Sequence, residues 1–227
     1  MIGVTENLKL ISNLLHSAAI EADRDPADVR LLAVSKKQPL EKIREAAAIG
    51  QRDFGENFVQ EGVEKIETLA DLGLTWHFIG HLQSNKTREV AENFDWVHTI
   101  DKFKTARRLS EQRPGGLPPL NICLQVNVDD EDSKSGVLPA ELPELAAACD
   151  ELPNLNLRGL MCLPAIRSEF EEQRKPFAAL RELAKQLSGA GVDTDTLSMG
   201  MTADYRAAIL EAATIVRIGT ALFGARN

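Results

Sequence analysis

The chain has 227 residues, 44% of them hydrophobic and 26% charged, which suits one globular domain with a sizeable core. Its 34 acidic and 26 basic residues give a net charge of −8, and an acidic surface repels phosphate backbones, so we expect no general nucleic-acid binding. Three widely spaced cysteines without a CxxC pair argue against a disulfide framework, and the absence of a signal peptide or a long apolar run predicts a cytoplasmic protein without a membrane span.

Strand and helix patterns alternate along the chain after one leading helix. The leading helix is predicted over 5–22, where apolar residues recur at helical spacing and Thr5 is a candidate N-cap. Short apolar runs, typical of strands buried on both faces, follow at regular intervals. We expect strands at 30–35, 53–55, 75–79, 95–100, 120–128, 155–163, 196–199 and 215–218, separated by helices at 39–49, 57–70, 84–92, 101–112, 139–152, 169–187 and 203–213.

This alternation predicts the α/β class with a parallel sheet. Eight units in this length fit a single (β/α)8 TIM-like barrel with an additional N-terminal helix, and we expect residues 1–227 to form one domain. The alternative is an open, doubly wound sheet. Such a sheet normally carries a glycine-rich phosphate fingerprint after its first strand, whereas SKKQPL at 35–40 contains no glycine, which favours the barrel.

Lys36 is the sharpest candidate for chemistry. Functional side chains of a barrel lie at the carboxyl ends of its strands, and Lys36 directly follows the buried run LLAVS. Burial lowers the pKa of a lysine, and the neutral amine can attack a carbonyl carbon to form a Schiff base. A lysine at a strand end is, taken alone, more often simply solvated. Lys37 should point elsewhere, because side chains alternate along an extended chain.

A phosphate site is indicated at the ends of the last two predicted strands. Ser198, Gly200, Gly219 and Thr220 supply hydroxyls and close backbone approach where barrels often hold phosphate. Turn formation alone could also explain these residues. Arg217 lies within the run IVRIG; it is either an outward ion-pair partner or a buried cation that needs an acceptor such as a pyridine nitrogen.

No metal site is expected. His77 and His81 lie on a strand and its exit and lack a third clustered ligand. The GxSxG, HExxH and P-loop patterns are also absent from the sequence.

Seven segments, in order along nearly the whole chain, resemble the pyridoxal-phosphate homeostasis protein family. They are AVSK at 33–36, FGENFVQE at 54–61, WHFIGHLQSNK at 76–86, SKSG at 133–136, GLM at 159–161, LSMGM at 197–201 and RIGTALFG at 217–224. The family is similar to the N-terminal barrel of alanine racemase, a fold-type III protein that uses pyridoxal 5′-phosphate.

The resemblance implies a covalent imine between Lys36 and pyridoxal 5′-phosphate. It further implies a set of cofactor-binding residues. Ser198, Gly219 and Thr220 would contact the phosphate, Arg217 would face the pyridine nitrogen, and Asn57 would lie near the ring. Met199 of the LSMGM motif also belongs to this set. Phe58 and Thr202 depart from the family's tyrosine and serine. Neither departure is expected to touch the lysine or the phosphate loop.

Two functions remain open for such a site, a cofactor carrier and an amino-acid racemase. Racemisation needs positioned acid/base groups on both faces of the substrate. Lys36 can serve one face; in the racemases the other group comes from an additional β domain, for which a chain ending at Asn227 leaves no room. Tyr205, the one tyrosine, is expected to be structural.

We therefore predict a carrier that stores or delivers pyridoxal phosphate, with no catalytic residue and no robust turnover. Its partners would be the small-molecule cofactor and pyridoxal-phosphate-dependent apo-enzymes, and a monomer is the simpler expectation. A third possibility is that the phosphate site holds another phosphorylated metabolite without any imine.

Overall fold

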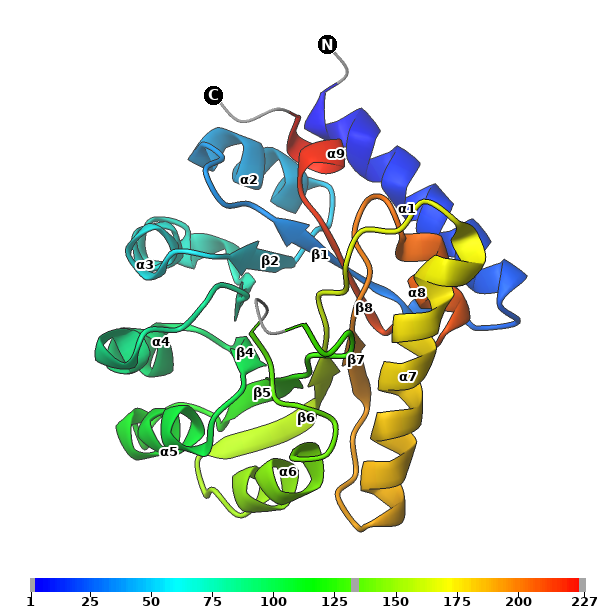
Figure 1. The fold of residues 1–227 in the computed structure, drawn as a ribbon. Coiled ribbons are helices and arrows are strands. Elements are labelled where there is room, and N and C mark those ends of the chain that lie inside the picture. Colours follow the sequence, from blue (N-terminus) through cyan, green and yellow to red (C-terminus); the bar gives the residue numbers. More distant parts are fainter. Residues whose placement is uncertain (1–2, 132–134, 225–227) are drawn as a thin grey trace.

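The computed structural model describes residues 3–131 and 135–224, in which eight parallel strands close into a barrel (Figure 1). Each strand pairs with its neighbours in sequence, and β8 closes the barrel against β1. The strands are β1 (Arg30–Val34), β2 (Asp53–Glu56), β3 (Thr75–Phe78), β4 (Trp96–Ile100), β5 (Leu120–Gln125), β6 (Leu155–Met161), β7 (Thr196–Ser198) and β8 (Ile215–Ile218). The (β/α)8 barrel prediction is confirmed and the open sheet is excluded.

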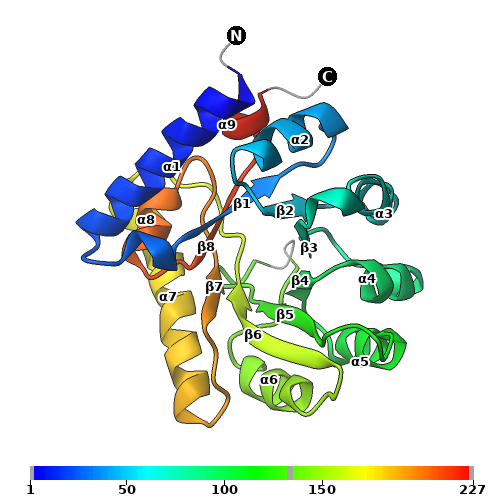
Figure 2. The ribbon, with the colours of Figure 1, turned by 180° about the vertical axis from the view of Figure 1, so that it is seen from behind.

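Helices surround the barrel on its outside, as the two opposite views in Figures 1 and 2 show. They are α1 (Val4–Glu21), α2 (Leu40–Ala48), α3 (Val59–Thr68), α4 (Thr87–Asn93), α5 (Phe103–Gln112), α6 (Leu142–Asp150), α7 (Phe170–Gly189), α8 (Tyr205–Leu210) and α9 (Thr220–Phe223). Short 3-10 helices lie at Pro26–Asp28, Ala70–Leu72 and Ser84–Lys86. Of the SKSG motif, Ser133 and Lys134 lie outside the described residues.

The predicted additional helix, α1, packs against the end of the chain. Its apolar side chains at Leu8, Ile11 and Leu15 recur at helical spacing and are buried, which gives the helix one apolar face. That face contacts α2, α8 and α9, and both views show α1 beside α8 and α9 (Figures 1 and 2). The helix therefore covers the seam where β8 meets β1.

Several predicted helix and strand ends were wrong. Gly3 rather than Thr5 is the N-cap of α1; the Glu6 carboxylate accepts the Gly3 N–H at 2.8 Å, and the Thr5 hydroxyl donates to Glu45. Strand β5 stops at Gln125 rather than at residue 128, because the backbone around Val126 turns away to pair with the segment at Val137.

Two further ends differ. Helix α5 begins at Phe103, after its N-cap Lys102, rather than at residue 101, and α8 is shorter than the predicted 203–213. Helix α9, which begins at Thr220, was not predicted.

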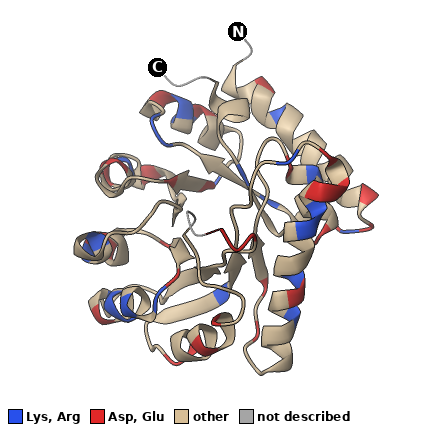
Figure 3. Cartoon of the chain, in the orientation of Figure 1, with Lys and Arg blue, Asp and Glu red and all other residues tan. Residues whose placement is uncertain are grey.

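Charged residues of both signs are interspersed along the outer helices (Figure 3). Many of them pair; on α7, for example, Arg174 and Arg181 both contact the carboxylate of Glu211. Cys123, Cys149 and Cys162 are buried, and the described residues form no disulfide. None of the described helices is long and apolar enough to cross a membrane, and the described residues contain no group of three or more side chains suited to hold a metal ion.

Candidate functional site

A cavity of about 230 Å³ lies at the carboxyl ends of the strands, and five predicted site residues line it. Loops after β1, β2, β3, β6, β7 and β8 form its walls, as expected for a functional site of this fold. Its lining consists of Val34, Lys36, Asn57, Ile79, Met161, Leu163, Met201, Thr202, Arg217, Gly219 and Thr220. The structure thus brings Lys36, Asn57, Arg217, Gly219 and Thr220 together.

Lys36 is half-buried in the turn that follows β1, and its two neighbours are held in place. The Ser35 hydroxyl donates to Glu56 Oε1 at 2.6 Å, and the Ser35 carbonyl accepts from Lys65 Nζ at 2.7 Å. On the other side, the Lys37 N–H donates to Glu61 Oε1 at 2.5 Å. Lys37 itself is exposed and does not line the cavity, as predicted. The position of Lys36 is therefore fixed on both sides along the chain.

The side chains that hold this turn form a buried charged cluster. Lys65 on α3 donates to Glu56 at 2.8 Å and to Glu61 at 2.7 Å, and Glu56 is completely buried. Burial raises the pKa of Glu56, although the adjacent ammonium of Lys65 opposes this effect. Since the second carboxylate oxygen of Glu56 has no hydrogen-bond partner in the described part of the chain, its desolvation cost is only partly offset.

Arg217 is a buried cation at the floor of the cavity. Its NH1 group donates to the backbone oxygen of Ser198 at 2.5 Å and to the Ser198 hydroxyl at 2.8 Å, and NH2 donates to the Cys162 carbonyl at 2.9 Å. Burial lowers the pKa of Arg217, yet a guanidinium stays protonated in proteins. The interior position decides between the two sequence interpretations, because Arg217 does not point outward.

Ser198 and Met199 differ from the other predicted residues. Both are completely buried and neither lines the cavity; the Ser198 hydroxyl instead faces Arg217 and, at 2.8 Å, the Nδ1 atom of His98. The chain turns at Gly200, whose φ is 91°, and brings Thr202 to the cavity wall. The threonine that departs from the family's serine thus lies in the cavity lining.

The remaining wall combines a close backbone approach with an unsatisfied polar atom. A Cβ atom on Gly219 would lie 3.2 Å from the Val34 carbonyl oxygen, so a side chain there would press on β1. Thr220 is exposed at the cavity rim. The Asn57 Oδ1 atom is buried and has no hydrogen-bond partner among the described residues. Buried oxygens normally have a partner, so this atom suits a ligand that supplies a donor.

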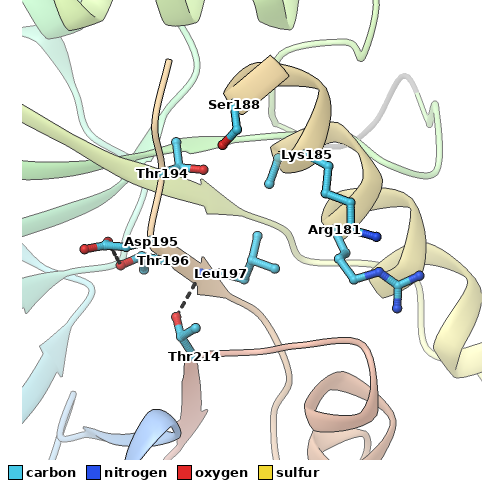
Figure 4. Close-up of a pocket in the computed structure, with 9 residues that line it drawn as sticks. Arg181, Lys185, Ser188, Thr194, Asp195, Thr196, Leu197 and Thr214 are labelled. Carbon is cyan, nitrogen blue, oxygen red and sulfur yellow. Dashed lines mark hydrogen bonds between the residues drawn. The ribbon is translucent and has the colours of Figure 1, made fainter. Parts of the chain in front are cut away.

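A second hollow, of about 310 Å³, lies at the opposite end of the barrel (Figure 4). It is formed by α7 and the starts of β7 and β8, and no predicted site residue lines it. Two hydrogen bonds join groups of its lining: the Leu197 N–H donates to the Thr214 hydroxyl at 2.9 Å, and the Thr196 hydroxyl donates to Asp195 at 2.8 Å. Residues at this end of a barrel usually serve stability, so the candidate site is the cavity at Lys36.

The fold and this cavity define a barrel of the fold-type III class, and comparison with known proteins agrees. The family described as alanine racemase, N-terminal domain, matches residues 11–227. The chain is 58% identical over 227 residues to the pyridoxal phosphate homeostasis protein of Pseudomonas aeruginosa, covering 100% of this chain and 97% of that one. It therefore belongs to the pyridoxal phosphate homeostasis protein family.

Solved structures show the same relationship. PipY of Synechococcus elongatus with pyridoxal phosphate bound is 37% identical, with a TM-score of 0.82 and coverage of 97% of this chain and 100% of that one. Alanine racemase of Corynebacterium glutamicum superposes with a TM-score of 0.72 at 16% identity, covering 98% of this chain and 61% of that one. This last likeness concerns the fold alone.

Proposed function

We propose that this protein binds pyridoxal 5′-phosphate in the cavity at Lys36 and stores or delivers it, without robust turnover of its own. The observation that carries the proposal is that one cavity gathers the Lys36 amine, the buried Arg217 guanidinium and the unpartnered Asn57 oxygen. The cofactor contains an aldehyde, a pyridine nitrogen and a phosphate, which match these groups. The name of the P. aeruginosa relative and the ligand of PipY support this assignment.

Each residue has a distinct part in the proposed site. Lys36 forms the covalent imine, and Arg217 donates toward the pyridine nitrogen, which stays unprotonated beside a permanent cation. This arrangement weakens the cofactor as an electron sink and suits a carrier better than a catalyst. The phosphate would lie at the open rim, near Gly219 and Thr220, with Ser198 and Met199 supporting the loop that reaches it. Asn57 would lie beside the ring.

The titratable side chains of the cavity favour a carrier over a racemase. Among the described residues that line it, these are Lys36 and Arg217, and a guanidinium does not release a proton. Racemisation requires a second acid/base group on the opposite face. Tyr205 does not line the cavity; it is half-buried at the start of α8. We further propose a cytoplasmic monomer that supplies apo-enzymes, and its buried cysteines, which form no disulfide among the described residues, agree with a reducing compartment.

The imine is tested by reduction and mass spectrometry. Purified protein loaded with pyridoxal phosphate should be yellow, and borohydride should fix the adduct on the peptide that contains Lys36. The Lys36→Ala variant should lose this adduct, whereas Lys37→Ala, its immediate neighbour, should keep it. An adduct found on another lysine would refute the assignment, and binding without any reducible adduct would favour a phosphorylated ligand held without an imine.

The absence of turnover is tested by proton exchange. With D- or L-alanine in deuterated buffer, the loaded protein should not exchange the α-proton at a rate above that of free pyridoxal phosphate. The measurement is the loss of the alanine α-proton signal in the NMR spectrum, with a known alanine racemase as positive control. Rapid exchange that disappears in Lys36→Ala would establish the racemase instead.

A further inference from the structure

A continuous line of hydrogen bonds crosses the barrel interior from the cavity to the opposite end. Arg217 NH1 lies 2.8 Å from Ser198 Oγ, which lies 2.8 Å from His98 Nδ1. His98 Nε2 lies 2.9 Å from His77 Nδ1, and His77 Nε2 lies 3.1 Å from Asp53 Oδ1. The five residues come from β8, β7, β4, β3 and β2, so the line spans the whole width of the barrel.

The carboxylate end of this line and the neutrality of its two buried imidazoles together fix the direction of every hydrogen bond within it. An ionised carboxylate can only accept, so His77 Nε2 carries a proton. A neutral imidazole has one N–H, so His77 Nδ1 accepts from His98 Nε2, and His98 Nδ1 in turn accepts from the Ser198 hydroxyl. The Ser198 oxygen keeps lone pairs for Arg217 NH1, which can only donate. With both imidazoles neutral, both are protonated on Nε2.

The surroundings of the rings agree with this protonation state. Both imidazoles are completely buried, and burial lowers the pKa of His77 and lowers that of His98 still further. His77 stacks on Trp96, with 5.3 Å between ring centroids and 11° between planes, which fixes the ring orientation. Asp53 lies at the partly exposed end of the line, where Arg30 NH1 is 3.9 Å from its Oδ1 atom.

We propose that Asp53, His77, His98 and Ser198 are positioning residues that hold the Arg217 guanidinium in place at the cofactor ring. A long arginine side chain has many rotamers, and a buried one needs acceptors to stay in a single conformation. The line supplies an acceptor whose direction is set by a carboxylate at the far end of the barrel. The consequence for pyridoxal phosphate rests on the proposed function, whereas the protonation pattern of the histidines does not.

The protonation pattern is tested on the protein without cofactor. Long-range ¹H–¹⁵N NMR distinguishes Nδ1–H, Nε2–H and doubly protonated imidazoles, and the variants His16→Gln and His81→Gln identify the two histidine signals that lie outside the line. Near pH 7, His77 and His98 should both be neutral and protonated on Nε2. An Nδ1–H ring or a doubly protonated ring at either position would overturn the proposal. This measurement needs no variant of the line to fold.

The effect on the cofactor is tested with a pair of variants at one position. In His98→Gln, an amide oxygen can accept from Ser198 while the amide nitrogen donates to His77; His98→Leu has similar bulk but does neither. The dissociation constant for pyridoxal phosphate should rise on the order of tenfold in His98→Leu and stay within roughly threefold of the parent in His98→Gln. Equal affinity of His98→Leu and parent, or equal weakness of both variants, would contradict positioning. If the parent itself fails to bind through Lys36, the proposed function fails and the histidine result stands independently.

Discussion

Contacts of the neighbouring residues hold the backbone at Lys36 in place. Lys37, the next residue, has a φ of 58°, a left-handed conformation that costs a non-glycine residue about 1 kcal/mol. The hydrogen bond from its N–H to Glu61 stabilises this conformation. Glu61 is in turn held by Lys65, which also reaches Ser35. A partly exposed residue of α3 thus sets the backbone that carries the Lys36 amine.

Removing the Glu61 side chain should therefore impair cofactor binding without touching the cavity. In Glu61→Ala, the Lys37 N–H loses a charged acceptor, and we expect a loss of about 1–2 kcal/mol in the free energy of unfolding and roughly tenfold weaker pyridoxal phosphate binding. Glu61→Gln keeps an acceptor oxygen and serves as the matched control, with binding close to that of the parent. Denaturant unfolding and spectroscopic titration measure the two quantities. Unchanged cofactor affinity in a destabilised Glu61→Ala would show that the turn does not position Lys36.

At the scale of elements, the sequence predicts the barrel because two simple patterns alternate. Strands buried on both faces appear as apolar runs, and outer helices appear as amphipathic segments. All eight strands and the helices between them overlap the segments that these patterns predict, although several ends differ. The strand ends then locate the cavity, which is why Lys36, Arg217 and the Gly219–Thr220 pair could be chosen in advance. The short α9 escapes prediction because four residues carry no periodicity.

What the sequence does not predict depends on how loops turn and on which interior side chains meet. The loop after β7 reverses at Gly200, and this turn decides that Thr202 reaches the cavity while Ser198 stays beneath Arg217. His98 lies inside the apolar run of β4, and nothing local indicates its contact with His77. The pairing of β3 with β4 creates that contact.

For the whole molecule, folding takes two imidazoles out of water and keeps them neutral. Burial lowers the pKa of both His77 and His98 from the ordinary value of 6.5. As pH falls below about 6.5, the unfolded chain binds protons at these histidines more readily than the folded chain does. More bound protons in the unfolded state means that stability rises with pH. The contribution is fully present above pH 6.5 and is lost as pH falls below that value.

The measurable consequence is a difference in acid sensitivity between the parent and His98→Gln, both without cofactor. Each buried neutral histidine should reduce the free energy of unfolding by up to about 1.4 kcal/mol per pH unit below pH 6. His98→Gln removes one of the two buried histidines. The difference in free energy of unfolding between parent and variant should therefore be constant between about pH 7 and 8. Below pH 6 it should shift in favour of the variant by up to about 1.4 kcal/mol per pH unit. Carboxylates also titrate in acid, but their contribution to stability is common to both proteins and cancels when the parent and His98→Gln are compared at the same pH. Parallel stability curves down to about pH 5 would mean that the folded protein protonates His98. A doubly protonated His98 donates from both ring nitrogens, so Ser198 could no longer donate to it and the proposed direction of the hydrogen bonds would be lost.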